Sequence, residues 1–537
     1  MGIDASKEHA TPLRREKQPI PEDEFRAGAA SVPLGPPLGL PMVGFVRQRA
    51  FARGYGLPLE ATAVVLERGD LRVVACAVDV LGLVYDEANV LIDHIVDRVG
   101  ASPDGVLLNW SHTHLAPRAS HVHHGSFLGD VDADRLTAVH AFERVIQDKI
   151  VTACELAAAR LEPATVVWGQ ADVDLSVNRR ERTTDGSNGG TKLGWNPDEL
   201  IDNQVTVLQA RRPDETAIAT VVGYGCHPVT TGFDMDIYSA DFVGPLRSLV
   251  RNVTGGECVY LQGAGGNVLP KFAFTDSEAE AVRMGSRIGL AAVESVADEF
   301  GTPVTVVSED EESAHAITRY RLTRQRSAVP ALAALREVVT IPLLRPLPRL
   351  EDVRELLVGY DAELEAAKAS GDNGRIRVAL FHQLWASRTE AALEAGTAET
   401  EVQTSINAIR IGDGAIVTGP GESFTEYSIA VKERSPGRPT MYAGYTNDLV
   451  GYLPTAREYE FGGFEAGYGF KSNGLPALFD PSVEEICVKT GVRLVERLFP
   501  DAQAWDDSAG WTAAGNPPAL QRTRLDHPSQ LELGARG

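Results

Sequence analysis

Short β-branched runs alternate with longer amphipathic stretches between residues 25 and 302, and this alternation constrains the fold more than any other feature of the sequence. The runs have the length of strands, and the stretches have the 3.6-residue spacing of helices. Such alternation predicts an α/β (α+β) protein of layered sheets with flanking helices. The expected strands are 61–67, 71–80, 105–114, 164–175, 204–211, 219–227 and 258–263, and the expected helices are 87–100, 139–161, 242–253 and 277–300.

The rest of the chain divides into four parts by composition. Residues 350–398 are rich in Leu, Ala, Glu and Arg at helical spacing, which predicts an inserted helical hairpin. Strands return around the GDG turn of 405–419. We expect one layered domain over 25–500, with a flexible leader over 1–24 and a flexible tail over 501–537. The leader has no apolar run that could serve as a secretory signal.

The charge balance restricts the partners of the chain. Among its 537 residues the formal net charge is −23, and the acidic excess is spread along the sequence. Such a surface repels phosphate backbones, so nucleic acid is not an expected partner. No segment reaches the roughly 18 apolar residues of a membrane span. The five cysteines are scattered and mostly lie in apolar runs, which indicates reduced thiols. We therefore expect a soluble, cytoplasmic protein.

Two histidines follow the apolar run GVLLNW in the sequence Ser111-His112-Thr113-His114. Alternate side chains of a strand share a face, so the imidazoles of His112 and His114 would project together from the strand end. This pattern suits one metal ligand and a neighbouring base. The alternative is that one or both are hydrogen-bonded structural histidines.

Two further candidates also follow apolar runs. His227 lies in GCHP, where a strand breaks into a loop, and Glu422 lies in PGES after the run AIVTG. Each has a structural alternative, because single histidines are often structural and a glutamate at a helix start commonly faces the helix dipole. Two histidines and one carboxylate together, however, form a familiar catalytic zinc set that leaves room for water.

A Gly-rich turn and a histidine cluster complete the candidates. Gln262-Gly263-Ala264-Gly265-Gly266-Asn267 follows a strand and could present N–H groups of Gly265 and Asn267 to a substrate oxygen, or could be a tight structural turn. His121, His123 and His124 lie in a loop, and we interpret them as a pocket rim or plain surface. No GxSxG elbow supports a serine hydrolase.

In their order, these pieces resemble the catalytic domain of the neutral/alkaline, non-lysosomal ceramidase family, over about residues 25–500. The motifs that carry the resemblance are FRAGAASVPLGPPLGLPMVGF, SHTH, GCHP, QGAGGNVLP, PGES and YTNDLVGYLPTAREYEFGGFEAG. The resemblance implies a divergent zinc-dependent amidohydrolase that cleaves a small N-acyl or ester substrate with metal-activated water. We expect no counterpart of the family's C-terminal immunoglobulin-like domain.

Individual roles follow from the resemblance alone. It implies Zn²⁺ ligands at His112, His227, Glu422 and Tyr452, the tyrosine of VGYLPT. It places His114 as the second histidine beside the metal, which shuttles the proton. Arg179 matches an Asn-Arg element that helps to hold the substrate. Asp79 and Asp241 could orient the imidazoles, or could be buried structural carboxylates.

Two departures bear on the substrate. Where the family's Gly-rich motif has a serine, this sequence has Leu269, and where the family has a later active-site tyrosine it has Phe464. A site with fewer hydroxyls changes its substrate preference strongly, so we do not expect ceramide itself. Hydrolysis of an ester or a cyclic amide, and a non-catalytic protein that uses the pocket only for binding, are the alternative functions.

Overall fold

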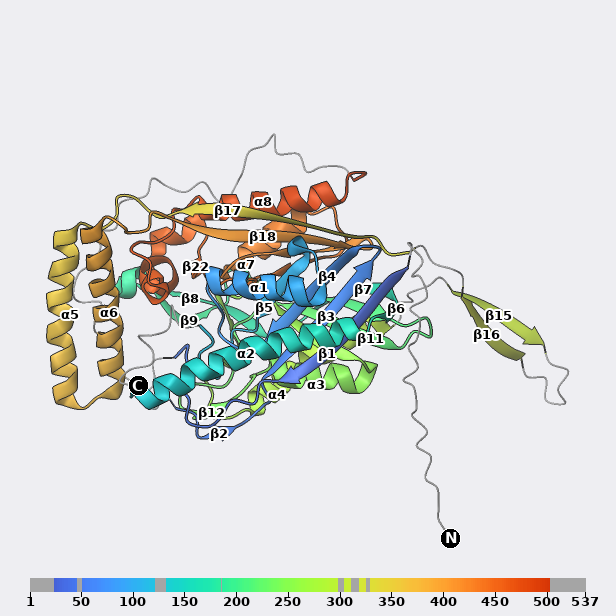
Figure 1. Cartoon of the computed structure of the whole chain (residues 1–537), viewed down its shortest axis with the longest axis horizontal. Coiled ribbons are helices and arrows are strands. Elements are labelled where there is room, and N and C mark those ends of the chain that lie inside the picture. Colours follow the sequence, from blue (N-terminus) through green and yellow to red (C-terminus); the bar gives the residue numbers. More distant parts are fainter. Residues whose placement is uncertain are drawn as a thin grey trace, which may run out of the picture.

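The computed structural model describes residues 24–45, 51–120, 132–184, 186–297, 304–310, 318–324 and 329–502. Mixed helices and strands make it an α/β protein, as the alternation predicts. Figure 1 shows the arrangement of these elements. The helices are α1 (Tyr85–Val99), α2 (Ala133–Ala159), α3 (Val243–Thr254), α4 (Ala279–Ala297), α5 (Leu350–Ser370), α6 (Asn373–Ala395), α7 (Thr425–Arg434) and α8 (Val483–Leu498).

Three larger sheets form the body of the described chain. The first has the order β5-β4-β3-β1-β6, the second β13-β11-β10-β7 and the third β17-β18-β19-β21. Their bounds are β1 Phe25–Pro33, β3 Glu60–Arg68, β4 Leu71–Val78, β5 Val106–Trp110, β6 Glu162–Pro163, β7 Thr165–Asp172, β10 Gln204–Arg211, β11 Ala217–Tyr224, β13 Glu257–Gln262, β17 Leu332–Pro342, β18 Glu401–Ile411, β19 Gly414–Thr418 and β21 Thr440–Ala443.

Smaller sheets connect to this body. They pair β12 (Ile237–Tyr238) with β2 (Gly54–Tyr55), β20 (Glu422–Ser423) with β22 (Tyr452–Leu453), and β15 (Val304–Asp310) with β16 (Thr318–Arg324). A three-stranded sheet has the order β14-β8-β9, with bounds Val268–Pro270, Ser176–Arg182 and Thr191–Asn196. The β15–β16 pair lies at one end of the molecule in Figure 1.

The three larger sheets share one apolar core, and helices cover their outer faces. Strand alternation decides which residue faces which side. Val221 of β11 and Ile416 of β19 contribute to the shared core, whereas the next residues, Val222 and Val417, face the clusters under the helices. In Figure 1, α2 runs along the first sheet and α8 lies over the third. This is the layered architecture that the sequence predicts.

The helical insertion also agrees with the sequence. Helices α5 and α6 pack together as a hairpin at the end of the molecule opposite β15–β16 (Figure 1). Trp385 of α6 anchors the hairpin, because its indole N–H donates to the carbonyl of Leu475 at 2.8 Å. No helix in the described part of the chain combines the length and apolarity that crossing a membrane requires. The predicted leader and tail fall almost entirely outside the described residues.

Several strands end at one place in the interior. The pairs β4–β5, β11–β13 and β19–β21 are parallel, so within each pair the carboxyl ends of the two strands lie at the same edge of the sheet. Asn109 of β5 joins these ends, since its Nδ2 donates to the carbonyls of Gln262 at 3.2 Å and Gly444 at 2.7 Å. The loops that follow these strands therefore meet, as loops at the carboxyl ends of parallel strands commonly do at binding sites.

Candidate metal centre

His112 stands two residues beyond the end of β5. Its backbone has a φ of 64°, in the left-handed region that non-glycine residues rarely adopt. Hydrogen bonds from Ser111 N to Val78 O and from His112 N to Val80 O, both 3.0 Å, hold this turn. The ring Nδ1 lies 2.8 Å from the carbonyl of Leu81, which makes it the donor and leaves a lone pair on Nε2.

His227 reaches the same space from the loop after β11. Its Nδ1 lies 2.6 Å from the carbonyl of Gly265, so Nε2 again carries the lone pair. Burial, followed by the nearby Arg179 guanidinium, lowers the pKa of His227 to about 4. The imidazole is therefore neutral near neutral pH, which is the form that binds a metal ion.

Glu422 completes the centre from β20, the short strand that follows β19 along the chain. Strand β20 pairs in parallel with β22, and this register sets Glu422 opposite Tyr452. Glu422 Oε2 lies 3.4 Å from Nε2 of His112 and 3.2 Å from Nε2 of His227. Burial raises the pKa of this carboxyl, and protons on the two imidazoles would lower it well below its usual range. A cation bound between the three groups would act in the same direction. The carboxylate is therefore ionised.

The donor set fits a metal ion. Glu422 Oε2 is buried and has no hydrogen-bond partner in the described structure, although it faces two ring nitrogens. Lone pairs on those nitrogens would repel a carboxylate oxygen unless a cation lay between them. Two imidazole nitrogens and one carboxylate oxygen are ligands that Zn²⁺ prefers. The structure thus brings His112, His227 and Glu422 together.

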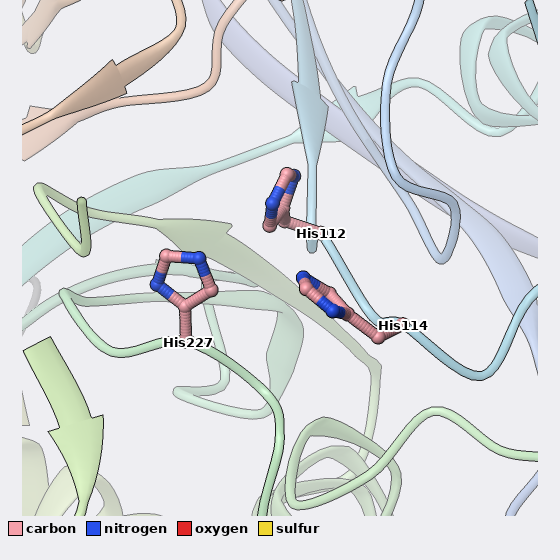
Figure 2. A group of neighbouring side chains, drawn as sticks. All are labelled: His112, His114 and His227. Atoms are coloured by element: carbon pink, nitrogen blue, oxygen red, sulfur yellow. The ribbon is translucent and has the colours of Figure 1, made fainter. Parts of the chain in front are cut away.

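His114 also lies at this centre. Figure 2 shows the three imidazoles gathered around one space, with ring centroids of His114 5.1 Å from His112 and 5.7 Å from His227. Ligand atoms of these three histidines lie within 4.8 Å of one another, so the buried cluster could hold a metal by itself. Burial, then His112 and His227, lower the pKa of His114 well below its ordinary value.

The strand argument for bringing His112 and His114 together is wrong, although the outcome holds. Strand β5 ends at Trp110, before either histidine. The left-handed turn at His112 bends the chain, and the T-shaped contact between the two rings follows from that bend. The pair is thus a product of a strained loop and not of strand alternation.

Arg179 and Tyr452 border the same space. Arg179 Nη1 lies 3.3 Å from Nε2 of His227, and its guanidinium lies 5.4 Å from the ring centre of Tyr452. Its Nε donates to Glu465 Oε1 at 2.6 Å, and the other oxygen of Glu465 accepts from Arg180 Nη1 at 2.8 Å. Arg179 is fixed from behind. Burial, followed by the Glu422 carboxylate, raises the pKa of Tyr452 well above its ordinary value.

The Gly-rich turn contacts the centre through an acceptor. The carbonyl of Gly265 accepts a hydrogen bond from Nδ1 of His227. Gly266 N donates to the carbonyl of Ser423 in β20 at 2.9 Å. The Asn267 side chain accepts from Thr425 N at 2.8 Å and donates to Glu426 at 3.0 Å. These contacts favour a positioning task for Gly265 and Asn267. Donation from the turn to a substrate oxygen stays a prediction.

Asp79 and Asp241 do not orient the imidazoles. Asp79 binds Arg247 at 2.5 Å and 3.1 Å, and Asp241 accepts from the backbone N–H groups of residues 230, 231 and 242. Their structural interpretation therefore holds, and the carbonyls of Leu81 and Gly265 take the orienting role. His121, His123 and His124 lie outside the described residues.

The two positions without a hydroxyl pack as apolar groups. Leu269 lies in a small cluster with Val177 and Val229. The ring of Phe464 meets that of Tyr452 edge to face at 5.4 Å. Both side chains therefore take part in packing, Leu269 with aliphatic groups and Phe464 with an aromatic ring.

Three residues of the centre escaped the sequence analysis. Asn109 ties the strand ends together, Glu465 holds Arg179, and Tyr445 places its ring 4.7 Å from that of His112. Asn109 lies in the run GVLLNW, and Tyr445 and Glu465 lie in the quoted motif 445–467. Only the folded structure distinguishes them from neighbouring residues of the same type.

The fold is similar to that of solved ceramidases. The neutral ceramidase from Pseudomonas aeruginosa matches with a TM-score of 0.58 and 17% identity, over 91% of this chain and 77% of that chain. A ceramidase solved in complex with C2 matches with a TM-score of 0.58 and 18% identity, over 90% and 76%. No protein-family model and no curated protein matches the sequence. The likeness confirms, for the fold, the resemblance to neutral ceramidases.

Proposed function

We propose that this chain is a zinc-dependent hydrolase that cleaves a linear N-acyl amide by metal-activated water. The observation that supports it most is the convergence of the two Nε2 atoms of His112 and His227 on the buried, unpartnered oxygen of Glu422. The similarity of the fold to neutral ceramidases adds support. We propose that the substrate is a small amide other than ceramide.

In this proposal His112, His227, Glu422 and Tyr452 hold the metal. When bound, Zn²⁺ supplies a water of lowered pKa and polarises the scissile carbonyl. A phenol oxygen is an uncommon ligand, and Tyr452 would ionise only beside such a cation. The carbonyls of Leu81 and Gly265 keep the imidazoles in the tautomer that binds.

The remaining side chains divide the acid–base and electrostatic work. His114 lies beside the two ligand imidazoles and would carry a proton to the leaving amine. Arg179, held by Glu465, would stabilise negative charge that develops on the acyl oxygen. The N–H groups of Gly265 and Asn267 remain candidate donors to the same oxygen.

Metal analysis of the purified protein tests the centre. We expect one equivalent of zinc in the wild-type chain prepared without chelator, and loss of zinc in His112→Ala and Glu422→Ala. His94→Ala is the matched control, because His94 is exposed on α1. Absence of stoichiometric zinc from the wild-type protein would contradict the mechanism.

Substrate analogues test the reaction. Amide and ester derivatives of one acyl group, compared at fixed enzyme, separate an amidase from an esterase, and a cyclic amide extends the comparison. A non-catalytic binding protein is the competing function, because Leu269 and Phe464 stand where the ceramidase family has a serine and a tyrosine. Tight binding of these compounds without turnover by the zinc-loaded protein would support that alternative.

A further inference from the structure

The hydroxyl of Tyr445 is buried beside the candidate metal centre without a partner. Tyr445 is 0% exposed, and its ring lies 4.7 Å from that of His112 and 6.1 Å from that of His227. Its Oη has no hydrogen-bond partner among the described residues. Buried tyrosine hydroxyls usually find a partner, and leaving one unsatisfied destabilises the folded state.

The backbone at Tyr445 is also unfavourable. Its φ of 50° lies in the left-handed region, which non-glycine residues rarely adopt. Two hydrogen bonds keep it there, from Trp110 N to Tyr445 O at 3.0 Å and from Tyr445 N to Gly421 O at 2.9 Å. The residue is thus fixed between the segments that carry His112 and Glu422.

The polar groups around the phenol belong to the same centre. The ionisable neighbours with the largest electrostatic effect on Tyr445 are Glu422, Tyr452 and Arg179. Glu422 and Tyr452 are assigned to the metal, and Arg179 is occupied by Glu465. A phenol at neutral pH is a hydrogen-bond donor, so the group that satisfies it must bring an acceptor oxygen.

We propose that Tyr445 Oη donates a hydrogen bond to the carbonyl oxygen of the bound acyl group. The inference rests on the proposed function and adds a donor from the segment after β21 to it. It also accounts for the two missing hydroxyls, since Tyr445 supplies a neutral donor where Leu269 and Phe464 supply none. The unsatisfied hydroxyl and the strained backbone are then features of a site prepared for its ligand.

Tyr445→Phe and the matched control Tyr459→Phe test the unsatisfied hydroxyl. Tyr459 Oη is also buried without a partner, but its main ionisable neighbours are Asp480 and Glu484. Loss of an unsatisfied hydroxyl should leave the melting temperature of either zinc-free variant equal to or above that of the wild-type protein. A lower melting temperature for Tyr445→Phe would show that the hydroxyl is already paired, and would overturn the proposal.

Binding of acetohydroxamate to the zinc-loaded proteins tests the donor itself, by calorimetry. Tyr445→Phe should bind this probe about 10-fold more weakly than wild type, and on any N-acyl amide that the wild type hydrolyses it should lose about 100-fold in kcat with a smaller change in KM. Tyr459→Phe should match the wild type in both. Equal probe affinities for Tyr445→Phe and wild type refute the role of Tyr445 alone, whereas a wild-type protein that binds neither zinc nor the probe refutes the zinc centre and this inference with it.

Discussion

A single methyl group on the Gly-rich turn should disturb the metal centre. A Cβ built on Gly266 would lie 2.3 Å from the carbonyl oxygen of Glu422 and 2.9 Å from that of Ser423. Since real Cβ atoms do not approach closer than 3.0 Å, Gly266→Ala must separate the turn from β20 by about 0.7 Å. The backbone of Glu422 is itself the contact, so no flexible side chain can absorb the change.

That displacement is large for a metal ligand. Ligand distances in metal sites vary by roughly 0.2 Å, and changes in groups that support the ligands typically cost 10–100-fold in metal affinity. We therefore expect Gly266→Ala to weaken zinc binding by about 10–100-fold and to lower hydrolytic activity by about 100-fold. Competition with a chromogenic zinc chelator measures the affinity, and circular dichroism checks that the variant is folded.

Gly265→Ala is the matched control in the same turn. A Cβ at Gly265 meets its nearest atoms, the backbone C and N of Cys226, at 3.3 Å, so the neighbours need to move by only a few tenths of an ångström. Its zinc affinity should stay within about threefold of wild type. If folded Gly266→Ala keeps wild-type affinity, Glu422 is not held by this turn or is not a ligand, and the reasoning fails.

Three further perturbations address proton transfer, pH and the hairpin. His114→Ala should lower kcat by about 100-fold and retain zinc, whereas loss of zinc would place His114 among the ligands. Burial raises the pKa of Asp448 to about 7. The folded state therefore binds a proton that the unfolded state releases near pH 4, so the free energy of unfolding, measured by urea melts, should fall between about pH 4 and 7. Asp448→Asn should flatten this slope, whereas removal of an exposed surface charge should not. Gly359 is exposed in α5, and a Cβ built on it would meet no neighbour. Gly359→Ala should therefore stabilise the hairpin by about 0.5–1 kcal/mol, measured by hydrogen exchange of the α5 amides. Faster exchange in the variant would contradict an unstrained helical site.

The sequence predicts the elements well because burial and periodicity are local. Runs such as 204–211 and 258–263 have β-branched or apolar residues on both faces, and both became strands of a sheet buried between the shared core and helices. The hairpin over 350–398 follows from helical spacing alone. His112, His227 and Glu422 were found because each stands just past an apolar run, where strand ends of α/β proteins place their ligands. Arg179 and Tyr452 were indicated by the resemblance alone.

The contacts that complete the site depend on partners far along the chain. The left-handed turn at His112 is held by the carbonyls of Val78 and Val80, and sequence periodicity carries no sign of it. Asn109 and Gln262 join two sheets across 153 positions of sequence. Strands β20 and β22 are only two residues long, too short for a pattern, yet their register sets Glu422 beside Tyr452. Sequence patterns therefore indicate which residues are candidates but not how they are held.

The distribution of donors around the centre bears on the substrate. Leu269 packs with Val177 and Val229, and the ring of Phe464 packs against that of Tyr452, so neither position offers a hydroxyl. Donors lie instead on the segments after β5 and β21 and on β8, from His114, Tyr445 and Arg179. A substrate matched to this arrangement needs its acceptor oxygen close to the scissile carbon, because a buried polar group that faced Leu269 or Phe464 would lose hydration without gaining a partner.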